Sequence, residues 1–312
     1  MKMKRQNWVY AAGIFAVLSL AACRQQPPAV SEEATESGEA LPDPRPVSPE
    51  FKKYWYAGVA ELTSYSLSQA RYGELHDGHA VLVYVTEPFD PVGQVKADRP
   101  DSTSVSVLKL NRSKKFLTGI YPYSIMSSIF YPVADNQHAL KLSTSVQEWC
   151  GHIYTQLNNR DQFEIRAYSY FESEGDQELT LDKAITEDEL WTKLRIAPDG
   201  LPTGSHTVMP SLEFLRLRHM PIQGYEATLT LSEPGDQRTY TLTYPELNRT
   251  LQIHFQGEFP YAIQGWTETH SSGFGPEAAV LTTTARANKT WIGPYWQEHL
   301  NQDLPLRDSL GL

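Results

Sequence analysis

Three residues whose side chains can do chemistry together lie within the segment SVQEWCGHIYTQ, residues 145–156: Glu148, Cys150 and His152. A cysteine reacts as its thiolate, which needs a basic neighbour to form near neutral pH, and a carboxylate can orient that base. Residues two apart on a β-strand share one face and are about 6.5 to 7 Å apart. The spacing therefore allows a catalytic site with Cys150 as the nucleophile, His152 as its base and Glu148 as the orienting group.

The same residues have two other interpretations. Cys150 and His152 have a spacing that zinc ligands adopt on strands, but a zinc site takes three or four ligands, and the other histidines show no ligand spacing. The HxxH pattern of His76 and His79 flanks an Asp-Gly pair and indicates a solvated turn. We therefore predict no metal site. We favour a structural interpretation, in which Cys150 is a small apolar residue on a core strand.

Motifs that would identify an enzyme class do not occur in the sequence. It has no GxSxG, P-loop, GxGxxG or HExxH motif and no cluster of cysteines. We therefore predict no cofactor and expect a non-enzymatic binding protein, with an enzyme that uses Cys150 as the alternative.

Residues 1–22 have the features of a lipoprotein signal peptide. A positive segment (KMKR), an apolar run and the bacterial lipobox LAAC follow one another. We predict cleavage before Cys23 and lipidation of its sulfur, which makes the membrane the first partner of the protein. Arg24 stands where an aspartate would retain a lipoprotein in the inner membrane. The predicted location is therefore the outer membrane, facing the periplasm, and display on the cell surface stays an alternative.

Residues 23–49 comprise the lipid anchor and a segment rich in proline, glutamate, serine and alanine, which predicts a flexible acidic tether. Of the 27 Lys and Arg residues, three belong to the signal peptide. The mature chain thus has 24 of them against 37 Asp and Glu, a net charge of −13. Such an acidic chain lacks the basic footprint of nucleic-acid binding, so we predict no nucleic-acid partner. Because lipidation uses the sulfur of Cys23, Cys150 has no disulfide partner within the chain.

The body, residues 50–312, has the pattern of a mainly β (β-rich α+β) protein built from antiparallel sheets. Short alternating segments predict a curved sheet or a sandwich, either continuous or divided into halves at 50–185 and 200–312. The segment SLEFLRLRH, residues 211–219, is one of the predicted strands. Asp77-Gly78 predicts the turn of the first hairpin.

Two segments depart from simple alternation. FLTGIYPYSIMSSIFYPV, residues 116–133, contains Pro122 and Pro132 and predicts an irregular, largely buried crossing segment. One middle helix is predicted near 186–196, because Thr186 and the glutamate three residues later form a capping box and a proline follows the helix.

Two further groups of side chains have a functional and a structural interpretation. Arg112, Lys114 and Lys115 form a small basic cluster, which we interpret as a solvated turn. Aromatic residues are dense in YWYAG, GIYPYSIMSSIFYP and TWIGPYWQEH. They could line a groove for glycan or acyl chains, because rings stack on sugars and pack against lipid. Packing of a large β core also explains them, and we favour it.

Long strings of the body, among them KKYWYAGVAELTSYSLSQARYGELHDGHAVLVYVTEPF, QEWCGH, GFGPEAAVLTTTA and DLPLRDSLGL, resemble an uncharacterised family of Bacteroidota lipoproteins. Proteins of that family commonly bear the label "septum formation inhibitor Maf". Maf proteins are cytosolic α/β nucleotide pyrophosphatases with a Ser-Pro-Arg-Arg-type segment. This chain has no such segment and a β pattern, so we do not expect Maf activity.

The resemblance assigns no catalytic residue. It does imply that two tripeptides, which begin at Asp101 and Asp308, fit an O-glycosylation pattern of exported Bacteroidota proteins, with Ser102 and Ser309 as the acceptors. Together with the lipobox, it favours a lipid-anchored protein of the cell envelope. Its expected ligand is a hydrophobic molecule, a glycan or a protein.

Overall fold

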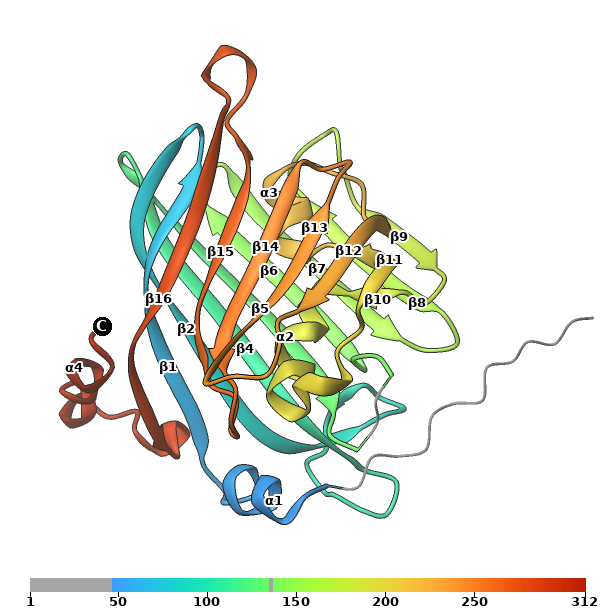
Figure 1. Cartoon of the computed structure of the whole chain (residues 1–312), viewed down its shortest axis with the longest axis vertical. Helices are drawn as coiled ribbons and strands as arrows, with labels where there is room; N and C mark the ends of the chain where they lie inside the picture. The colour runs from blue at the N-terminus through green and yellow to red at the C-terminus, as the bar shows by residue number, and fades with distance from the viewer. Residues whose placement is uncertain (1–46, 135–136) are drawn as a thin grey trace, which may run out of the picture. The chain divides into compact units, whose positions relative to one another are not determined.

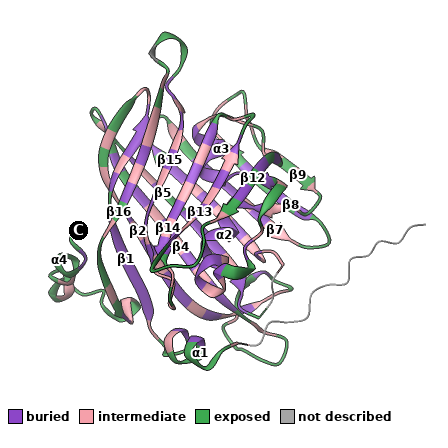
Figure 2. Ribbon diagram, viewed as in Figure 1, coloured by how far each residue is buried: buried purple, intermediate pink, exposed green. Residues whose placement is uncertain are grey.

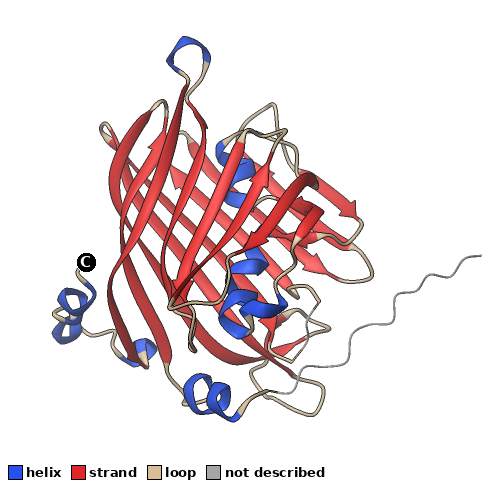
Figure 3. Cartoon of the chain, in the orientation of Figure 1, coloured by secondary structure: helices blue, strands red, loops and turns tan. Residues whose placement is uncertain are grey.

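The structure, a computed structural model, describes residues 47–134 and 137–312, so Cys23 and most of the predicted tether lie outside the described residues. Within them the chain is mostly β, as predicted (Figures 1 and 3). The strands are β1 Ala60–Arg71, β2 Glu74–Asp90, β3 Val95–Lys96, β4 Val105–Thr118, β5 Tyr121–Pro132, β6 Lys141–Glu148, β7 Gly151–Asn159, β8 Phe163–Ser169, β9 Gln177–Leu181, β10 Ile185–Thr186, β11 Gly204–Met209, β12 Tyr225–Leu231, β13 Gln237–Tyr244, β14 Arg249–Gln256, β15 Ile263–Ser272 and β16 Ala279–Gly293.

These strands form one curved sheet in the order β10-β11-β12-β13-β14-β15-β16-β1-β2-β4-β5-β6-β7-β8-β9, with β3 paired to β2 beside this path. Within the described residues, neighbouring strands of this sheet pair antiparallel, except β10 with β11, which pair parallel. β16 pairs with β1 along most of its length, from Ala60 opposite Gly293 to Ser68 opposite Thr284. The last long strand thus joins the first, and the strands of 60–181 and of 204–293 belong to a single sheet.

The described residues contain four α-helices: α1 Pro49–Trp55, α2 Glu187–Ile196, α3 Leu212–Leu217 and α4 Leu306–Leu310. The predicted middle helix, α2, is confirmed with its capping box: the Thr186 side chain accepts from the Glu189 N–H, and the Glu189 carboxylate accepts from the Thr186 N–H. These two bonds use N–H groups that a helix start otherwise leaves without partners. The sheet curves around α2, which makes ion pairs with both β4 and β14.

The prediction of a strand at 211–219 was wrong, because residues 212–217 form α3. Ser211 caps this helix by accepting a hydrogen bond from the Phe214 N–H at 3.2 Å. All six of its residues are buried. A short segment buried on every side has no polar face, so its apolar residues fit a strand and a helix equally well.

The predicted Asp77-Gly78 turn was also wrong. β2 runs straight through both residues, and the hairpin turns at Tyr72 and Gly73, whose φ angles are 54° and 82°. Gly78 instead allows β2 and β4 to approach each other, because a Cβ atom there would lie 2.2 Å from the carbonyl oxygen of Lys115. Glycine within a strand often marks such a close approach rather than a turn.

The segment 116–133 is regular, which contradicts the predicted irregular crossing. β5 occupies 121–132 and pairs with β4 and β6. Its two prolines are the second and the last residues of the strand, where a missing N–H removes little from the ladder.

Burial alternates along most strands (Figure 2), so that one side of the sheet faces the enclosed helices. Trp55, Trp191 and Trp266 are almost completely buried there. Much of the aromatic-rich composition is therefore core packing. None of the helices in the described residues is both long and apolar enough to span a membrane.

Candidate functional site

Glu148, Cys150 and His152 do not share a strand face. Glu148 ends β6 and pairs with Gly151, the first residue of β7, so Trp149 and Cys150 form a two-residue turn. Cys150 is exposed, which contradicts our interpretation of a buried core cysteine. The period-2 argument failed because the chain reverses direction between the glutamate and the histidine.

The surroundings of the thiol do not activate it. The Glu148 carboxylate accepts the Cys150 N–H at 2.6 Å. The same carboxylate raises the pKa of the Cys150 thiol, first through a side-chain hydrogen bond with it and also through its negative charge. A higher pKa leaves less thiolate at neutral pH. In the part of the chain that the structure describes, no hydrogen bond joins His152 to Cys150, and no group of three or more His, Cys, Asp and Glu residues could hold a metal ion.

The predicted basic cluster is split between the two faces of β4. Arg112 and Lys114 point inward and are only 3% and 5% exposed, whereas Lys115 is exposed. Arg112 pairs with Asp188 of α2 at 2.9 Å, and Lys114 pairs with Glu213 of α3 at 2.8 Å. The interpretation as a solvated turn was wrong, because strand alternation sends residues 112 and 114 into the interior.

Two more buried arginines complete an ionic network around the helices. Arg249 of β14 donates to both carboxylate oxygens of Glu187 and, through Nε, to Glu268 at 2.7 Å. Arg195 of α2 holds Glu61 of β1 with two bonds of 2.7 and 2.8 Å. These charges all have partners inside the protein. Buried ion pairs of this kind fix the position of one element against another, so we assign the network a structural role.

The outer side of β7 and β8 carries two exposed rings, Tyr154 and Tyr168, which we call the aromatic platform. Their exposed fractions are 40% and 47%. Tyr154 of β7 lies directly opposite Tyr168 of β8. Strand register thus places two aromatic side chains side by side on one patch of surface. Trp149 and Tyr170 are also exposed, but they lie in the chain segments just before β7 and just after β8.

Polar side chains continue the platform along β7. The Tyr154 hydroxyl donates to Gln156 Oε1 at 2.8 Å, and the Gln156 amide donates to Asn158 Oδ1 at 2.6 Å. Each of these groups keeps further donor or acceptor capacity toward solvent. Trp149, in the turn before β7, lies instead against Tyr121 of β5, with ring centroids 6.1 Å apart and planes at 28°. The platform therefore combines ring faces with a row of hydrogen-bonding groups.

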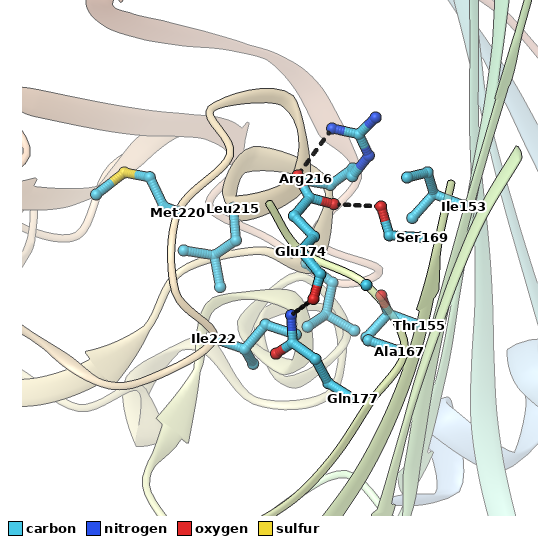
Figure 4. Close-up of a pocket in the computed structure, with 12 residues that line it drawn as sticks. Ile153, Thr155, Ala167, Ser169, Glu174, Gln177, Leu215, Arg216, Met220 and Ile222 are labelled. Atoms are coloured by element: carbon cyan, nitrogen blue, oxygen red, sulfur yellow. Dashed lines mark hydrogen bonds and ion pairs between the residues drawn. The ribbon is translucent and has the colours of Figure 1, made fainter. Parts of the chain in front are cut away.

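The inner face of the same two strands lines a small cavity beneath α3 (Figure 4). Glu174 accepts from the Ser169 hydroxyl at 2.6 Å and pairs with Arg216 at 3.4 Å within it. The cavity volume is about 40 Å³. This is room for about one water molecule, whose share of the liquid is ≈ 30 Å³. The cavity is too small for a ligand, so the outer face is the better candidate site.

Sequence reasoning did not identify the platform, although its signal is readable. In QFEIRAYSYFES the inward positions of β8 are Phe163, Ile165 and Ala167, so Tyr168 falls on the outward, polar side. Ser102 and Ser309, the two predicted acceptors of O-glycosylation, are both exposed, as an acceptor of a modification must be.

Comparisons with known proteins do not assign a function. No family model and no curated protein matches the chain. The crystal structure of a beta-barrel-like protein of domain of unknown function DUF1849 from Brucella abortus is similar, with 9% sequence identity and a TM-score of 0.44. The match covers 75% of this chain and 97% of that chain. Resemblance at this level carries no functional argument, so the function has to be inferred from the residues themselves.

Proposed function

We propose that this chain is a lipid-anchored protein of the bacterial cell envelope that acts by binding a glycan on the aromatic platform. The observation that carries the proposal is the pair of exposed rings, Tyr154 and Tyr168, which lie directly opposite each other on neighbouring strands. Exposed aromatic patches on soluble bodies commonly mark interaction sites. Burying these rings against a partner removes apolar surface from water, at roughly 25 cal/mol per Å².

A glycan fits this surface better than the other two expected ligand classes. The flat faces of Tyr154 and Tyr168 suit the apolar faces of sugar rings, and the amides of Gln156 and Asn158 suit sugar hydroxyls. A purely hydrophobic ligand favours an enclosed pocket, whereas these strands carry the rings on their outer face. A protein partner is the outcome that remains if no glycan binds.

The enzymatic alternative lacks support from the surroundings of Cys150. A nucleophilic cysteine needs a neighbour that lowers its pKa, such as a positively charged histidine or a metal ion. Here the nearest ionisable partner, Glu148, raises the pKa of the thiol. Binding therefore remains the function that the described residues support best.

Glycan binding is tested by titrating the purified protein against an array of defined bacterial envelope oligosaccharides and by co-sedimentation with purified peptidoglycan sacculi. The Tyr154→Ala/Tyr168→Ala variant should lose binding by at least about tenfold, because truncating a central aromatic contact costs roughly 2 kcal/mol. Tyr56→Ala is the matched control, since Tyr56 is 42% exposed but lies at the end of α1. Equal binding by the platform variant and the wild type would refute the site, and binding to none of the glycans would refute the ligand class.

The anchor is tested independently of the ligand. A Cys23→Ser variant expressed in the native host should move from the membrane fraction to the soluble fraction, because the lipid is the predicted attachment. The wild-type protein should co-fractionate with outer-membrane markers on a density gradient. Retention of Cys23→Ser in the membrane fraction would contradict lipid anchoring and would leave the platform proposal untouched.

A further inference from the structure

A second, larger cavity is lined by residues of α1, of the end of α2 and of the loop before β15, none of which belongs to the platform. Figure 1 shows where these elements lie. The volume of the cavity is about 280 Å³. Ligand pockets typically measure ≈ 300–1,000 Å³, so this cavity suits a small molecule. Its walls come from four separate parts of the chain, 47–51, Val133, 196–199 and 259–261, which makes it a product of the tertiary fold.

Aromatic side chains form much of the lining. Phe51 of α1 and the loop residues Phe259 and Tyr261 all border the cavity. The rings of Phe259 and Tyr261 stand at 85° with centroids 5.8 Å apart, and Tyr54 meets Phe259 at 84° and 5.6 Å. Perpendicular rings that pack against each other hold their orientation without a ligand. The face of an aromatic ring carries partial negative charge and attracts cations.

The charged groups at the cavity, like the ring faces, favour a positively charged ligand. Glu50 and Asp199 both line it. Arg238 pairs with Asp199 at 2.7 Å, whereas within the described residues no ion pair involves Glu50. Burial first, and then the charges of Asp199 and Glu50, raise the pKa of the Tyr261 hydroxyl, and the charge of Arg238 opposes them. The three charged groups sum to −1, so an anionic ligand is disfavoured and a single positive charge would be neutralised.

We propose that this cavity binds a small organic cation, an ammonium group carried on a short apolar body, between the rings of Phe51, Phe259 and Tyr261 and the Glu50 carboxylate. The ammonium group would lie against the ring faces near Glu50, and the apolar part would contact Ile196 and Pro198, which also line the cavity. This site is independent of the glycan platform. It adds a small-molecule ligand that the proposed function does not require.

The test uses two probes of equal shape, choline and its uncharged analogue 3,3-dimethylbutan-1-ol, titrated into the purified protein by isothermal titration calorimetry and ligand-observed NMR. Cation–π contacts contribute roughly 0.5–2 kcal/mol, so choline should bind about tenfold more tightly than the alcohol. Equal affinity of the two probes would show an apolar cavity without charge selection and would overturn the proposal. Binding of neither probe would overturn it as well.

Three variants separate the contribution of the Glu50 carboxylate to choline binding from that of the Tyr261 ring. Glu50→Gln should weaken choline binding several-fold and leave the alcohol unchanged, and Tyr261→Leu should weaken choline more than the alcohol. Glu74→Gln is the matched control, because Glu74 is an exposed acid at the start of β2, away from this cavity. The platform variant Tyr154→Ala/Tyr168→Ala should bind choline normally. An unchanged choline affinity in both Glu50→Gln and Tyr261→Leu would place the cation elsewhere and refute the assignment.

Discussion

Replacing Arg195 by methionine should destabilise the protein strongly, because it leaves a buried carboxylate without its partner. Arg195 and Glu61 are 1% and 3% exposed. The guanidinium donates to both oxygens of Glu61 and, through Nε, to the Pro260 carbonyl at 2.9 Å. It also lies over the rings of Trp55 and Tyr84. Methionine is an uncharged side chain that removes the positive charge, the donors and the guanidinium contacts with these rings.

The expected loss of unfolding free energy follows from the groups that lose their partners. Burial by itself would raise the pKa of Glu61, but the charge and hydrogen bonds of Arg195 outweigh it and lower that pKa. Without Arg195 the ionised Glu61 keeps only the bond from the Tyr54 hydroxyl at 2.6 Å. Breaking a buried ion pair from one side costs about 3–5 kcal/mol. We therefore expect Arg195→Met to lower the free energy of unfolding by about 3–5 kcal/mol.

Urea unfolding at pH 7, followed by tryptophan fluorescence, measures this loss. Arg166→Met is the matched control: Arg166 also pairs with a glutamate, Glu178 at 3.6 Å, but both side chains are more than 60% exposed. Exposed ion pairs contribute about 0–1 kcal/mol, so the control should change little. Glu61→Gln should destabilise the wild type yet stabilise the Arg195→Met protein, because the neutral amide leaves no buried charge. Two results would refute the reasoning. One is a loss of unfolding free energy below about 1 kcal/mol for Arg195→Met. The other is a change in unfolding free energy on Glu61→Gln that has the same sign in the wild type and in the Arg195→Met protein.

Two further predictions concern ionisation. Burial would raise the pKa of Glu268, but nearby positive charges, Arg249 first and then His270, lower it from 4.5 to about 2. A folded pKa below the unfolded one stabilises the protein above pH 4.5, and this is lost as the pH falls toward 2. The unfolding free energy of Glu268→Gln should therefore drop by about 2 kcal/mol less than that of the wild type between pH 5 and pH 3, measured by urea titration. For the exposed Cys150 thiol, Glu148→Gln should lower the pKa and speed alkylation by iodoacetamide at pH 8.

Each of these has a result that would contradict it. Parallel pH profiles of Glu268→Gln and the wild type would mean that this carboxylate does not contribute to acid stability. An alkylation rate unchanged by Glu148→Gln would mean that the carboxylate does not influence the thiol. Complete alkylation of the urea-unfolded protein serves as the control that Cys150 is reduced in every sample.

The sequence predicts the β architecture because each long strand obeys local rules of alternation and β-branched composition. The same rules failed where two structures satisfy one pattern. Leu212 to Leu217 are buried on all sides, so alternation could not distinguish α3 from a strand. At Asp77-Gly78 a turn dipeptide lies within β2, because the contact that needs the glycine comes from β4, more than thirty residues later. Contacts between distant segments are not encoded in a local window.

The candidate chemistry at 148–152 failed for a related reason. The two-residue turn at Trp149 and Cys150 forms because β6 pairs with β7. Trp-Cys is not a dipeptide typical of turns, so the local sequence does not indicate it. The charges of β4 illustrate the opposite case. Alternation along β4 could have indicated the inward direction of Arg112 and Lys114, which we interpreted as part of a solvated turn. Their acidic partners, Asp188 and Glu213, lie about seventy to one hundred positions away and are recognised only in the folded protein.

The outward side of β8 shows why the aromatic platform indicates function rather than folding. Inward residues of this strand, such as Ile165 and Ala167, are buried and hold it against the core. The outward Tyr168 and its neighbour Tyr154 on β7 contribute little to that packing, since 47% and 40% of these residues remain exposed to water. Serine or threonine at these two positions would satisfy the strand equally well. Large rings that the fold does not need, placed together on one surface, are therefore best explained by a partner that covers them.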